Sequence, residues 1–475
     1  MNLLQPFFIE AAARGARTAI VAANGSSATY ADLMAQSARL AAVWQRNGIG
    51  AGDRVLLAMP LGIPLYASLA ALWRLGAVVV FPEPALGLSG LRHAVAVTKP
   101  KAFLAGGWFR ALRLAWPALW RIPMITPGDV AADAVAGSDP LASMAADHPA
   151  LISFTSGSTG KPKTIVRSHG FLARQNACVA DLLKPQREDE VDLVAFPVFV
   201  LANLGLGVTS VLPNWNLRRH DTADAGSIAR HAATHHVTRA LIPPSICEKL
   251  TRGPAMRLDA IFTGGGPVFP DLLERLAAKM PHADIVSVYG STEAEPIAHQ
   301  HVGDISAEDW RTMRGGGGLL AGTPIPDIQL KILEDEIVVT GDHVNKGYLD
   351  PADDRTTKLA LDDTIWHRTG DAGRVDATGR LWLLGRLDGR AKGLFPFGVE
   401  AAARFWPNVR QAALVAIDDR PVLAIAGDPG SRDLWQREAD RIGALRVVAV
   451  KSIPLDRRHQ SKIDYSALRK LLGGP

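Results

Sequence analysis

One short loop gathers the residue types that can hold a phosphate group. It follows an apolar run, residues 151–154, and consists of Thr155, Ser156, Gly157, Ser158, Thr159, Gly160, Lys161, Pro162 and Lys163. Glycines let backbone N–H groups converge on an anion, while hydroxyls add donors and lysines add positive charge. Pro162 breaks the G-x-x-x-x-G-K-[ST] spacing of the common phosphate loop, so the pattern predicts a phosphate cradle of another kind. A flexible Ser/Gly linker is the weaker interpretation, because the loop is short and lies between strand-like segments.

Seven further segments follow in a fixed order. They are TGGGPVF (263–269), YGSTEAEP (289–296), EIVVTG (336–341), KGYLD (346–350), TGD (369–371), GRLDGRAK (385–392) and SKID (461–464). With the loop at 155–163, this series resembles the motifs of the AMP-forming adenylating enzymes, which include acyl-CoA synthetases, peptide-synthetase adenylation domains and luciferases. The amino-acid sequences of several segments are most similar to the fatty-acyl ligase-like branch, which includes the olefin-biosynthesis β-lactone synthetases.

The resemblance implies an ATP site with Mg²⁺ as its metal. Tyr289 offers a flat face for adenine, and Asp371 can accept hydrogen bonds from the ribose hydroxyls with Arg386 beside it. The nucleotide-binding residues carried over are Thr155, Ser156, Gly157, Ser158, Thr159, Gly160, Lys161, Lys163, Gly264, Gly265, Gly266, Pro267, Tyr289, Gly290, Ser291, Asp371 and Arg386.

The same resemblance implies three catalytic residues. Thr292 can hydrogen-bond the α-phosphate or the substrate carboxylate, and Glu293 is a hard oxygen ligand for the magnesium ion. Lys462 would place a compact cation where negative charge builds at the α-phosphorus. The implied reaction is the attack of a carboxylate on ATP, which releases pyrophosphate and leaves an acyl-adenylate.

A stretch without charged residues, 193–217, suggests the acid. Its apolar side chains suit an acyl pocket, although plain core packing explains them equally well. The pocket residues proposed from it are Phe196, Phe199, Val200, Asn203 and Leu204. With the resemblance, this stretch favours a fatty or β-hydroxy fatty acid.

The acyl acceptor is left open by two departures from the family pattern. Relatives that use coenzyme A continue from the position of Lys392 with an arginine-containing stretch, whereas here GLFPFGVE follows, and Ser461 stands where a glycine is usual. The acceptor is then coenzyme A, a carrier-protein thiol, or the substrate's own β-hydroxyl, which would close a β-lactone. A non-catalytic homologue that binds nucleotide or acyl chains is a further alternative, which the retained charged residues argue against.

The order of strand-like and helix-like runs predicts an α/β fold. Alternation up to about residue 320 favours parallel sheets covered by helices, and the short strands that follow favour a small, antiparallel, β-barrel-like region. We expect a large domain over residues 1–386 and a small, mobile α+β cap over 387–475, with Asp388 at the hinge. Thr29 is expected to cap a helix that buries Leu33, Leu40 and Trp44.

Charge and composition limit the functional class. The chain of 475 residues has 52 Lys and Arg against 47 Asp and Glu, a net +5. Two stretches, 101–128 and 451–475, each carry +4, and neither resembles a nucleic-acid-binding scaffold. Only two cysteines and a start without a basic leader favour a reducing, cytoplasmic location.

Two smaller features remain. Residues 107–121 interleave Trp108 and Trp120 with arginines, which suggests weak peripheral membrane association, although an ordinary packed helix is the more common case. His231, His235 and His236 are expected on one helix; no third ligand for zinc is evident, so a surface helix is the better interpretation.

Overall fold

The computed structural model of the chain describes residues 1–82, 87–129, 141–156, 162–418, 420–443, 446–456 and 461–473. It divides into two compact units. Unit 1 comprises Met1–Asn214, His235–Val237 and Asp342–Thr356, and unit 2 comprises Trp215–Thr234, Thr238–Gly341 and Thr357–Pro475. The mixed α/β architecture confirms the predicted fold class.

Unit 1 begins with α1 (Gln5–Ala13) and contains two sheets. The six-stranded sheet has the order β6-β5-β3-β4-β7-β8, and only β7 and β8 pair antiparallel among its neighbours. Its strands are β3 (Arg54–Ala58), β4 (Val78–Phe81), β5 (Ala102–Ala105), β6 (Met124–Ile125), β7 (Pro149–Ser156) and β8 (Pro162–Ser168). The runs in β3, β4 and β5 are continuously apolar because both faces of a parallel sheet are covered by helices.

The other strands of unit 1 belong to a 14-stranded sheet. Among them, β9 (Val191–Val194), β10 (Thr209–Val211) and β1 (Thr18–Val21) pair in parallel, and β2 (Ser27–Thr29) lies antiparallel at the edge. The helices of this unit are α2 (Tyr30–Arg46), α3 (Ile63–Arg74), α4 (Gly87–Thr98), α5 (Leu112–Ala115), α6 (His169–Leu182) and α7 (Phe199–Leu206). The uncharged stretch 193–217 is thus strand, helix and strand. Among the described residues, no helix combines the length and apolarity needed to cross a membrane.

Helix α2 shows how local sequence sets an element. Thr29 and Asp32 form a reciprocal capping box, in which each side chain accepts the other's backbone N–H at 3.0 Å. The helix ends at Arg46 and is capped by Asn47, before Gly48 in a left-handed conformation, and it buries Leu33, Leu40 and Trp44 as predicted.

Unit 2 contains a long mixed sheet. Strands β11 (Arg239–Leu241), β12 (Ala260–Gly264) and β13 (Asp284–Ser291) are parallel, and β14 (Ala294–His301) turns back antiparallel to β13. The antiparallel strands β15 (Leu319–Pro324), β20 (Leu381–Arg386), β19 (Thr364–Val375), β17 (Glu336–Thr340) and β16 (Gln329–Leu333) continue it, and β18 (Lys358–Leu361) pairs with β19. The predicted change from parallel to antiparallel strands is therefore confirmed.

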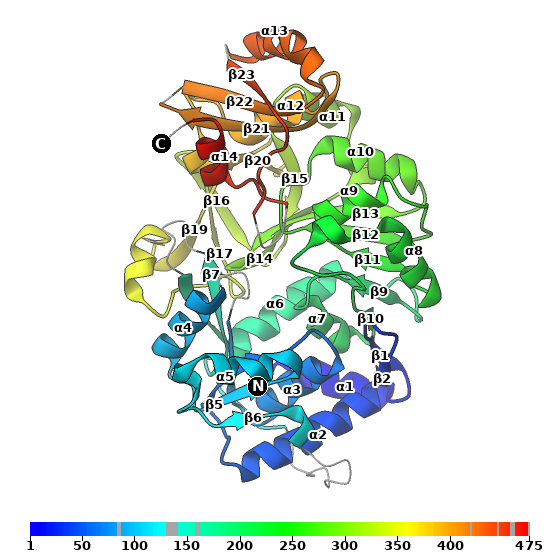
Figure 1. Ribbon diagram of the computed structural model, residues 1–475, viewed down its shortest axis with the longest axis vertical. Helices are drawn as coiled ribbons and strands as arrows, with labels where there is room; N and C mark the ends of the chain where they lie inside the picture. Colours follow the sequence, from blue (N-terminus) through cyan, green and yellow to red (C-terminus); the bar gives the residue numbers. More distant parts are fainter. Residues whose placement is uncertain are drawn as a thin grey trace. The chain divides into compact units, whose positions relative to one another are not determined.

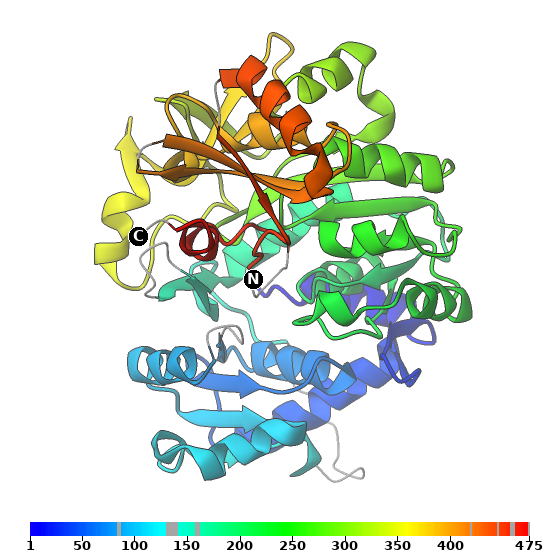
Figure 2. The same ribbon diagram turned by 45° about the horizontal axis from the view of Figure 1, so that its top comes forward.

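The end of the chain forms a three-stranded sheet within unit 2. Its strands are β21 (Val409–Ile417), β22 (Arg420–Gly427) and β23 (Arg446–Val450). Side chains of α12 (Pro396–Ala403) and α13 (Arg432–Gly443) join the apolar cluster on one face, and α14 (Tyr465–Leu471) joins the cluster on the other (Figures 1 and 2). The alternation of buried residues along β21 and β22 supplies both clusters.

One helix prediction is wrong. Helix α8 (Ala225–Thr234) carries His231 but ends before His235, and His236 adopts a positive φ of 52°. His235 and His236 therefore do not continue the face on which His231 lies. No group of three or more His, Cys, Asp or Glu side chains suited to a metal ion occurs among the described residues.

Candidate functional site

The predicted phosphate loop connects two paired strands of unit 1. Thr155 of β7 lies opposite Lys163 of β8, and Ser156 lies opposite Pro162. This pairing holds the two ends of the loop together. The predicted residues Gly157, Ser158, Thr159, Gly160 and Lys161 lie outside the described residues.

Lys163 is placed by Tyr348, a residue to which the sequence assigned no role. The Lys163 ammonium lies 5.4 Å from the centre of the Tyr348 ring, within cation–π range. Tyr348 is buried, forms an isolated bridge with Ile165 of β8, and donates its backbone N–H to Asp354 at 2.9 Å. Tyr348 lies in the KGYLD segment, which the sequence analysis noted without assigning an interaction to its tyrosine.

In unit 2, three predicted nucleotide-binding residues form one cluster. Asp371 of β19 and Arg386 of β20 are directly paired across the two strands, and their side chains form an ion pair at 3.0 Å. The Tyr289 hydroxyl, on β13, donates to the other carboxylate oxygen of Asp371 at 2.8 Å. Burial and the neighbouring Asp371 carboxylate hold the pKa of Tyr289 well above its usual range, so the phenol stays a proton donor.

Glu336 of β17 fixes the loop that carries Asp371. Its carboxylate accepts the Gly370 N–H at 3.0 Å and pairs with Arg368 at 2.5 Å. The Thr369 hydroxyl donates to the Ile337 carbonyl and accepts the Asp371 N–H. Gly370 has φ +70°, and a β-carbon there would lie 2.5 Å from the Arg386 guanidinium. The positive φ therefore favours the glycine of T-G-D, and a larger residue there would also have to displace the Arg386 side chain.

The predicted glycine segment after β12 meets the segment that carries Lys462. Gly265 adopts φ +76°, and a β-carbon on Gly266 would lie 2.6 Å from the β-carbon of Ser461. Gly264 closes β12 against Val288 of β13, where a β-carbon would lie 2.5 Å from the Val288 carbonyl oxygen. Residues distant in sequence thus come together within unit 2.

The backbone at Lys462 is held by Asp456. One Asp456 oxygen accepts the backbone N–H groups of Ser461 at 3.3 Å and Lys462 at 3.0 Å, and the Asp456 N–H donates to the Lys462 carbonyl. A bridge between Leu455 and Ile463 closes the base of the loop. The backbone of Lys462 is therefore fixed, while its side chain is exposed.

The predicted catalytic pair Thr292 and Glu293 occupies the turn between β13 and β14. Ser291 pairs with Ala294 across this turn, and Gly290 permits its close approach, since a β-carbon there would lie 3.1 Å from the Ala294 carbonyl. Thr292 and Glu293 are half-buried. The turn lies at the end of the strand that carries Tyr289.

The predicted acyl-pocket residues lie on and next to α7 in unit 1. Phe196 and Phe199 are partly exposed and pack edge to face, with ring centres 5.5 Å apart. Val200, Asn203 and Leu204 are buried. Asn203 donates to Asp192 at 3.0 Å and to Ser210 at 3.1 Å, so its amide holds β9 and β10 to the helix. Their assignment to a substrate pocket stays a prediction.

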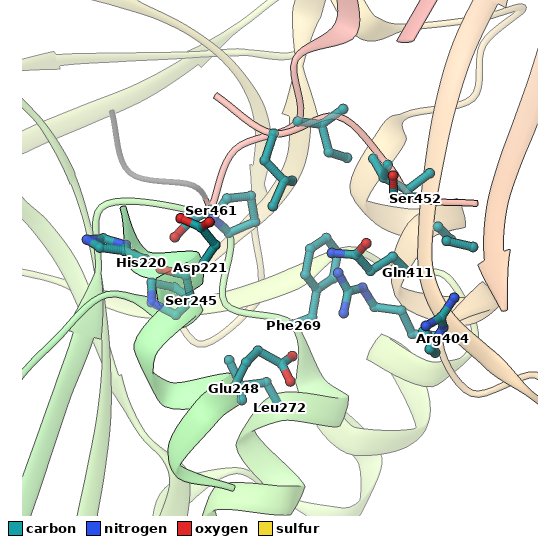
Figure 3. Close-up of a pocket in the computed structure, with 18 of the residues that line it drawn as sticks. His220, Asp221, Ser245, Glu248, Phe269, Leu272, Arg404, Gln411, Ser452 and Ser461 are labelled. Carbon is teal, nitrogen blue, oxygen red and sulfur yellow. Dashed lines mark hydrogen bonds between the residues drawn. The ribbon is translucent and has the colours of Figure 1, made fainter. Parts of the chain in front are cut away.

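A cavity of about 410 Å³ lies in unit 2 next to the Lys462 loop (Figure 3). Pro267, Phe269 and Leu272 line one wall, and Gln411, Ser452 and Ser461 line others. Its basic side chains are Lys249, Arg252, Arg404, Arg410 and Lys451, against the acids Asp221 and Glu248. A partly apolar cavity with an excess of cations suits a ligand that carries both an apolar arm and negative charge.

Glu400 is a buried carboxylic acid beneath this region that the sequence did not identify. It is fully buried on α12, and one oxygen accepts the Leu414 N–H at 3.0 Å and the Tyr465 hydroxyl at 3.2 Å. Burial raises its pKa to about 7. Tyr465 follows Lys462 by three residues, so Glu400 anchors the segment that carries the lysine. The only feature of the sequence that could have pointed to Glu400 is the presence of an acidic residue inside the apolar run of α12.

The predicted hinge residue, Asp388, lies in a short 3-10 turn (Leu387–Gly389) directly after β20 and is exposed. Lys392, a few residues later, adopts a positive φ of 45°. The two residues border the passage from β20 to α12. The domain boundary at residue 386 and the hinge role stay predictions.

Comparison with known proteins agrees with this geometry. The family model described as AMP-binding enzyme matches residues 7–349. An olefin beta-lactone synthetase of Xanthomonas campestris pv. campestris is 28% identical, with 94% of this chain and 92% of that protein covered. A feruloyl-CoA synthase of Amycolatopsis sp. is 29% identical over 83% of this chain and 82% of its own length.

Solved structures share the fold. ATP-bound MatB from Rhodopseudomonas palustris superposes with a TM-score of 0.84 at 22% identity, covering 99% of both chains. The amide bond synthetase McbA from Marinactinospora thermotolerans gives 0.82 at 22% identity, again over 99% of both chains. The family match spans most of the chain, and the fold agrees over nearly all of it. The chain therefore belongs to the AMP-binding enzyme family and is an adenylate-forming enzyme that activates a carboxylic acid.

Proposed function

We propose that this enzyme converts a fatty or β-hydroxy fatty acid and ATP to an acyl-adenylate, and then transfers the acyl group to a thiol. The observation that carries the adenylation step is the Tyr289–Asp371–Arg386 cluster. Its carboxylate can accept from ribose hydroxyls while the arginine next to it holds its charge and position.

In the first step a carboxylate oxygen of the acid forms a bond to the α-phosphorus. The bond from that phosphorus to the bridging oxygen breaks, and pyrophosphate leaves with the electron pair. Lys462 neutralises the charge that develops on the α-phosphate, and Thr292 orients the reacting carboxylate or phosphate. No side-chain nucleophile is needed, because the enzyme contributes position and charge.

Magnesium is held in this proposal by Glu293. The described residues contain no cluster of three or more His, Cys, Asp or Glu side chains for a metal. Proteins commonly bind magnesium through one or two carboxylates together with substrate phosphates, so the single carboxylate of Glu293 can serve in this role. When bound, the ion would screen the negative charge of the triphosphate.

In the second step the sulfur of coenzyme A or a carrier protein attacks the acyl carbon. The acyl–phosphate bond breaks, AMP leaves, and the thiol proton passes to solvent. The basic cavity beside the Lys462 loop supports this acceptor class, because an extended thiol arm with a phosphate at its far end matches its apolar walls and excess cations. The feruloyl-CoA synthase relative also supports a thiol.

A second candidate is closure of a β-lactone, in which the substrate's own β-hydroxyl oxygen attacks the acyl carbon and AMP leaves. It is favoured by the similarity to an olefin beta-lactone synthetase over 94% of the chain and by the stretch after Lys392, which lacks the arginines usual in enzymes that use coenzyme A.

One experiment separates these functions. Pyrophosphate release is measured with fatty, β-hydroxy fatty, aryl and amino acids, with and without coenzyme A, and the products are identified by mass. Release with fatty or β-hydroxy fatty acids and a thioester product is expected. A mass lower than the β-hydroxy acid by one water would instead assign the lactone, and release only with aryl or amino acids would contradict the substrate class.

A further inference from the structure

Residues 107–121 of unit 1 form an anchored surface segment. The chain passes through η2 (Gly107–Ala111), α5 and η3 (Pro117–Leu119), next to β5 and β6 (Figure 1). Trp116 and Leu119 are buried in the core of the six-stranded sheet, and Phe109 and Leu112 pack against it. Pro117 separates α5 from η3, so the segment is not one continuous helix. The segment's inner side is therefore already fully used by the fold.

The same segment also carries large apolar side chains that are exposed and are not packed in the core. Trp108 is 62% exposed, Leu114 83% and Trp120 59%. The Trp108 ring stacks on Phe109 at 3.9 Å, and the Trp120 indole N–H donates to the Arg113 carbonyl at 2.6 Å. Both rings are held in place by these contacts, so their exposure is a fixed property of the surface. Isolated exposed apolar residues are ordinary, but no other stretch of thirteen described residues exposes three large apolar side chains.

The charge of this surface identifies the partner. Arg110 and Arg121 are exposed and Arg113 is half-buried, and none of the three forms an ion pair with another described residue. No Asp or Glu occurs between residues 101 and 128. Tryptophan and arginine together prefer the boundary between lipid headgroups and acyl chains, where the rings are half-immersed and the guanidinium groups meet phosphates.

We propose that this surface docks the enzyme on anionic lipid bilayers. Trp108, Leu114 and Trp120 insert at the headgroup boundary, and Arg110, Arg113 and Arg121 contact lipid phosphates. A protein partner would require an acidic surface shaped to isolated protruding rings, whereas a bilayer supplies both components without shape matching. The proposal is independent of which acid the enzyme activates.

The test is co-sedimentation of the full chain with vesicles at low salt. One set contains phosphatidylcholine alone, and the other an equal mixture of phosphatidylcholine and phosphatidylglycerol. Binding to the mixed vesicles is expected, with weaker binding as salt rises. Changing Arg110, Arg113 and Arg121 together to Gln should lower the partition coefficient roughly 100-fold, since each cation near an anionic surface contributes about fivefold.

The apolar contribution is tested separately with Trp108→Ser, Leu114→Ser and Trp120→Ser combined, which should also lower binding at least about tenfold. The control for the arginine variant changes Arg432, Arg437 and Arg441 of α13 to Gln. The control for the apolar variant changes the exposed Ile9, Ile365 and Leu471 to Ser. Both control variants should bind vesicles like the wild type. Circular dichroism is used to check that each variant is folded. Vesicle binding can be measured whether or not the enzyme activates an acid.

Three outcomes would overturn the proposal. The wild type could fail to sediment with mixed vesicles at low salt, the apolar variant could sediment as well as the wild type, or the control variants could lose binding equally. Light scattering adds a fourth: if the patch variants abolish self-association of a protein that does not bind vesicles, the occupant is a second copy of the chain.

Discussion

The two basic stretches of this chain carry the same net charge and have different surroundings. In residues 451–475, Lys462 is held on a loop fixed by Asp456, beside Gly266 and a cavity with further cations. In residues 101–128, the arginines alternate with exposed tryptophans over a filled core. The number of basic residues in a stretch therefore does not by itself identify the negatively charged molecule that the stretch binds. In our proposals, the first stretch places one cation beside a small ligand, and the second spreads several cations over a surface.

The largest effect is expected at Lys462. Changing it to Ala should lower acid-dependent pyrophosphate release roughly 100-fold or more, because a charge aimed at the developing phosphate charge is removed. The matched control is Lys470→Ala, on the exposed side of α14, which should stay close to the wild type. Equal losses in both variants would show that the stretch acts through bulk charge, as we propose for residues 101–128, and would remove the contrast.

The Asp371 cluster is expected to give the next effect. Asp371→Asn keeps the size of the side chain but removes the charge that pairs with Arg386 and weakens acceptance from ribose. The KM for ATP should rise about tenfold with a smaller change in kcat. Asp362→Asn, in an exposed turn of the same unit, is the control. An unchanged KM for ATP would place the ribose elsewhere.

Glu400 gives a pH-dependent effect on stability. Its pKa rises from 4.5 unfolded to about 7 folded, so the folded state binds more protons between these values and loses stability as pH rises through that window. The loss amounts to about 3 kcal/mol, because the pKa rises by about 2.5 and each pKa unit corresponds to 1.36 kcal/mol. Glu400→Gln should remove this slope in urea unfolding measured from pH 4 to 8. A slope identical to the wild type would show that Glu400 is not the titrating group.

The smallest effect is expected from the arginines of the other stretch. The combined change of Arg110, Arg113 and Arg121 to Gln should alter pyrophosphate release by less than about twofold with a water-soluble acid, since no site residue lies in that segment. A larger loss, with circular dichroism unchanged, would show that both basic stretches serve catalysis.

Much of the fold could be predicted from hydrophobic periodicity and from the residues that begin and end helices and strands. The helix capped by Thr29, the strand at 260–264 and the change to antiparallel strands after residue 320 all follow from local patterns that burial then reinforces. His235 was misplaced because the helix ends at Thr234, with His236 in a left-handed conformation that no residue type there announces.

The sequence named a set of candidate site residues but not their arrangement in space. The contact of Tyr289 with Asp371 depends on the order and register of strands, which sequence spacing does not encode. Glu336, Tyr348 and Glu400 act by orienting other residues, and a positioning residue has no motif of its own. The positions of Val200 and Leu204 show the converse, because an apolar run reads the same whether it lines a pocket or fills a core.

The central claim is acid activation through an acyl-adenylate, and a single-turnover reaction tests it most directly. Enzyme in excess is mixed with ATP, Mg²⁺ and a β-hydroxy or plain fatty acid, without any thiol, and pyrophosphate and acyl-AMP are followed by mass. We predict that pyrophosphate and acyl-AMP form in equal amounts with the plain fatty acid, at a rate that Lys462→Ala lowers strongly. Pyrophosphate absent from a folded wild-type sample with every acid, or formed without any acid, would contradict the account.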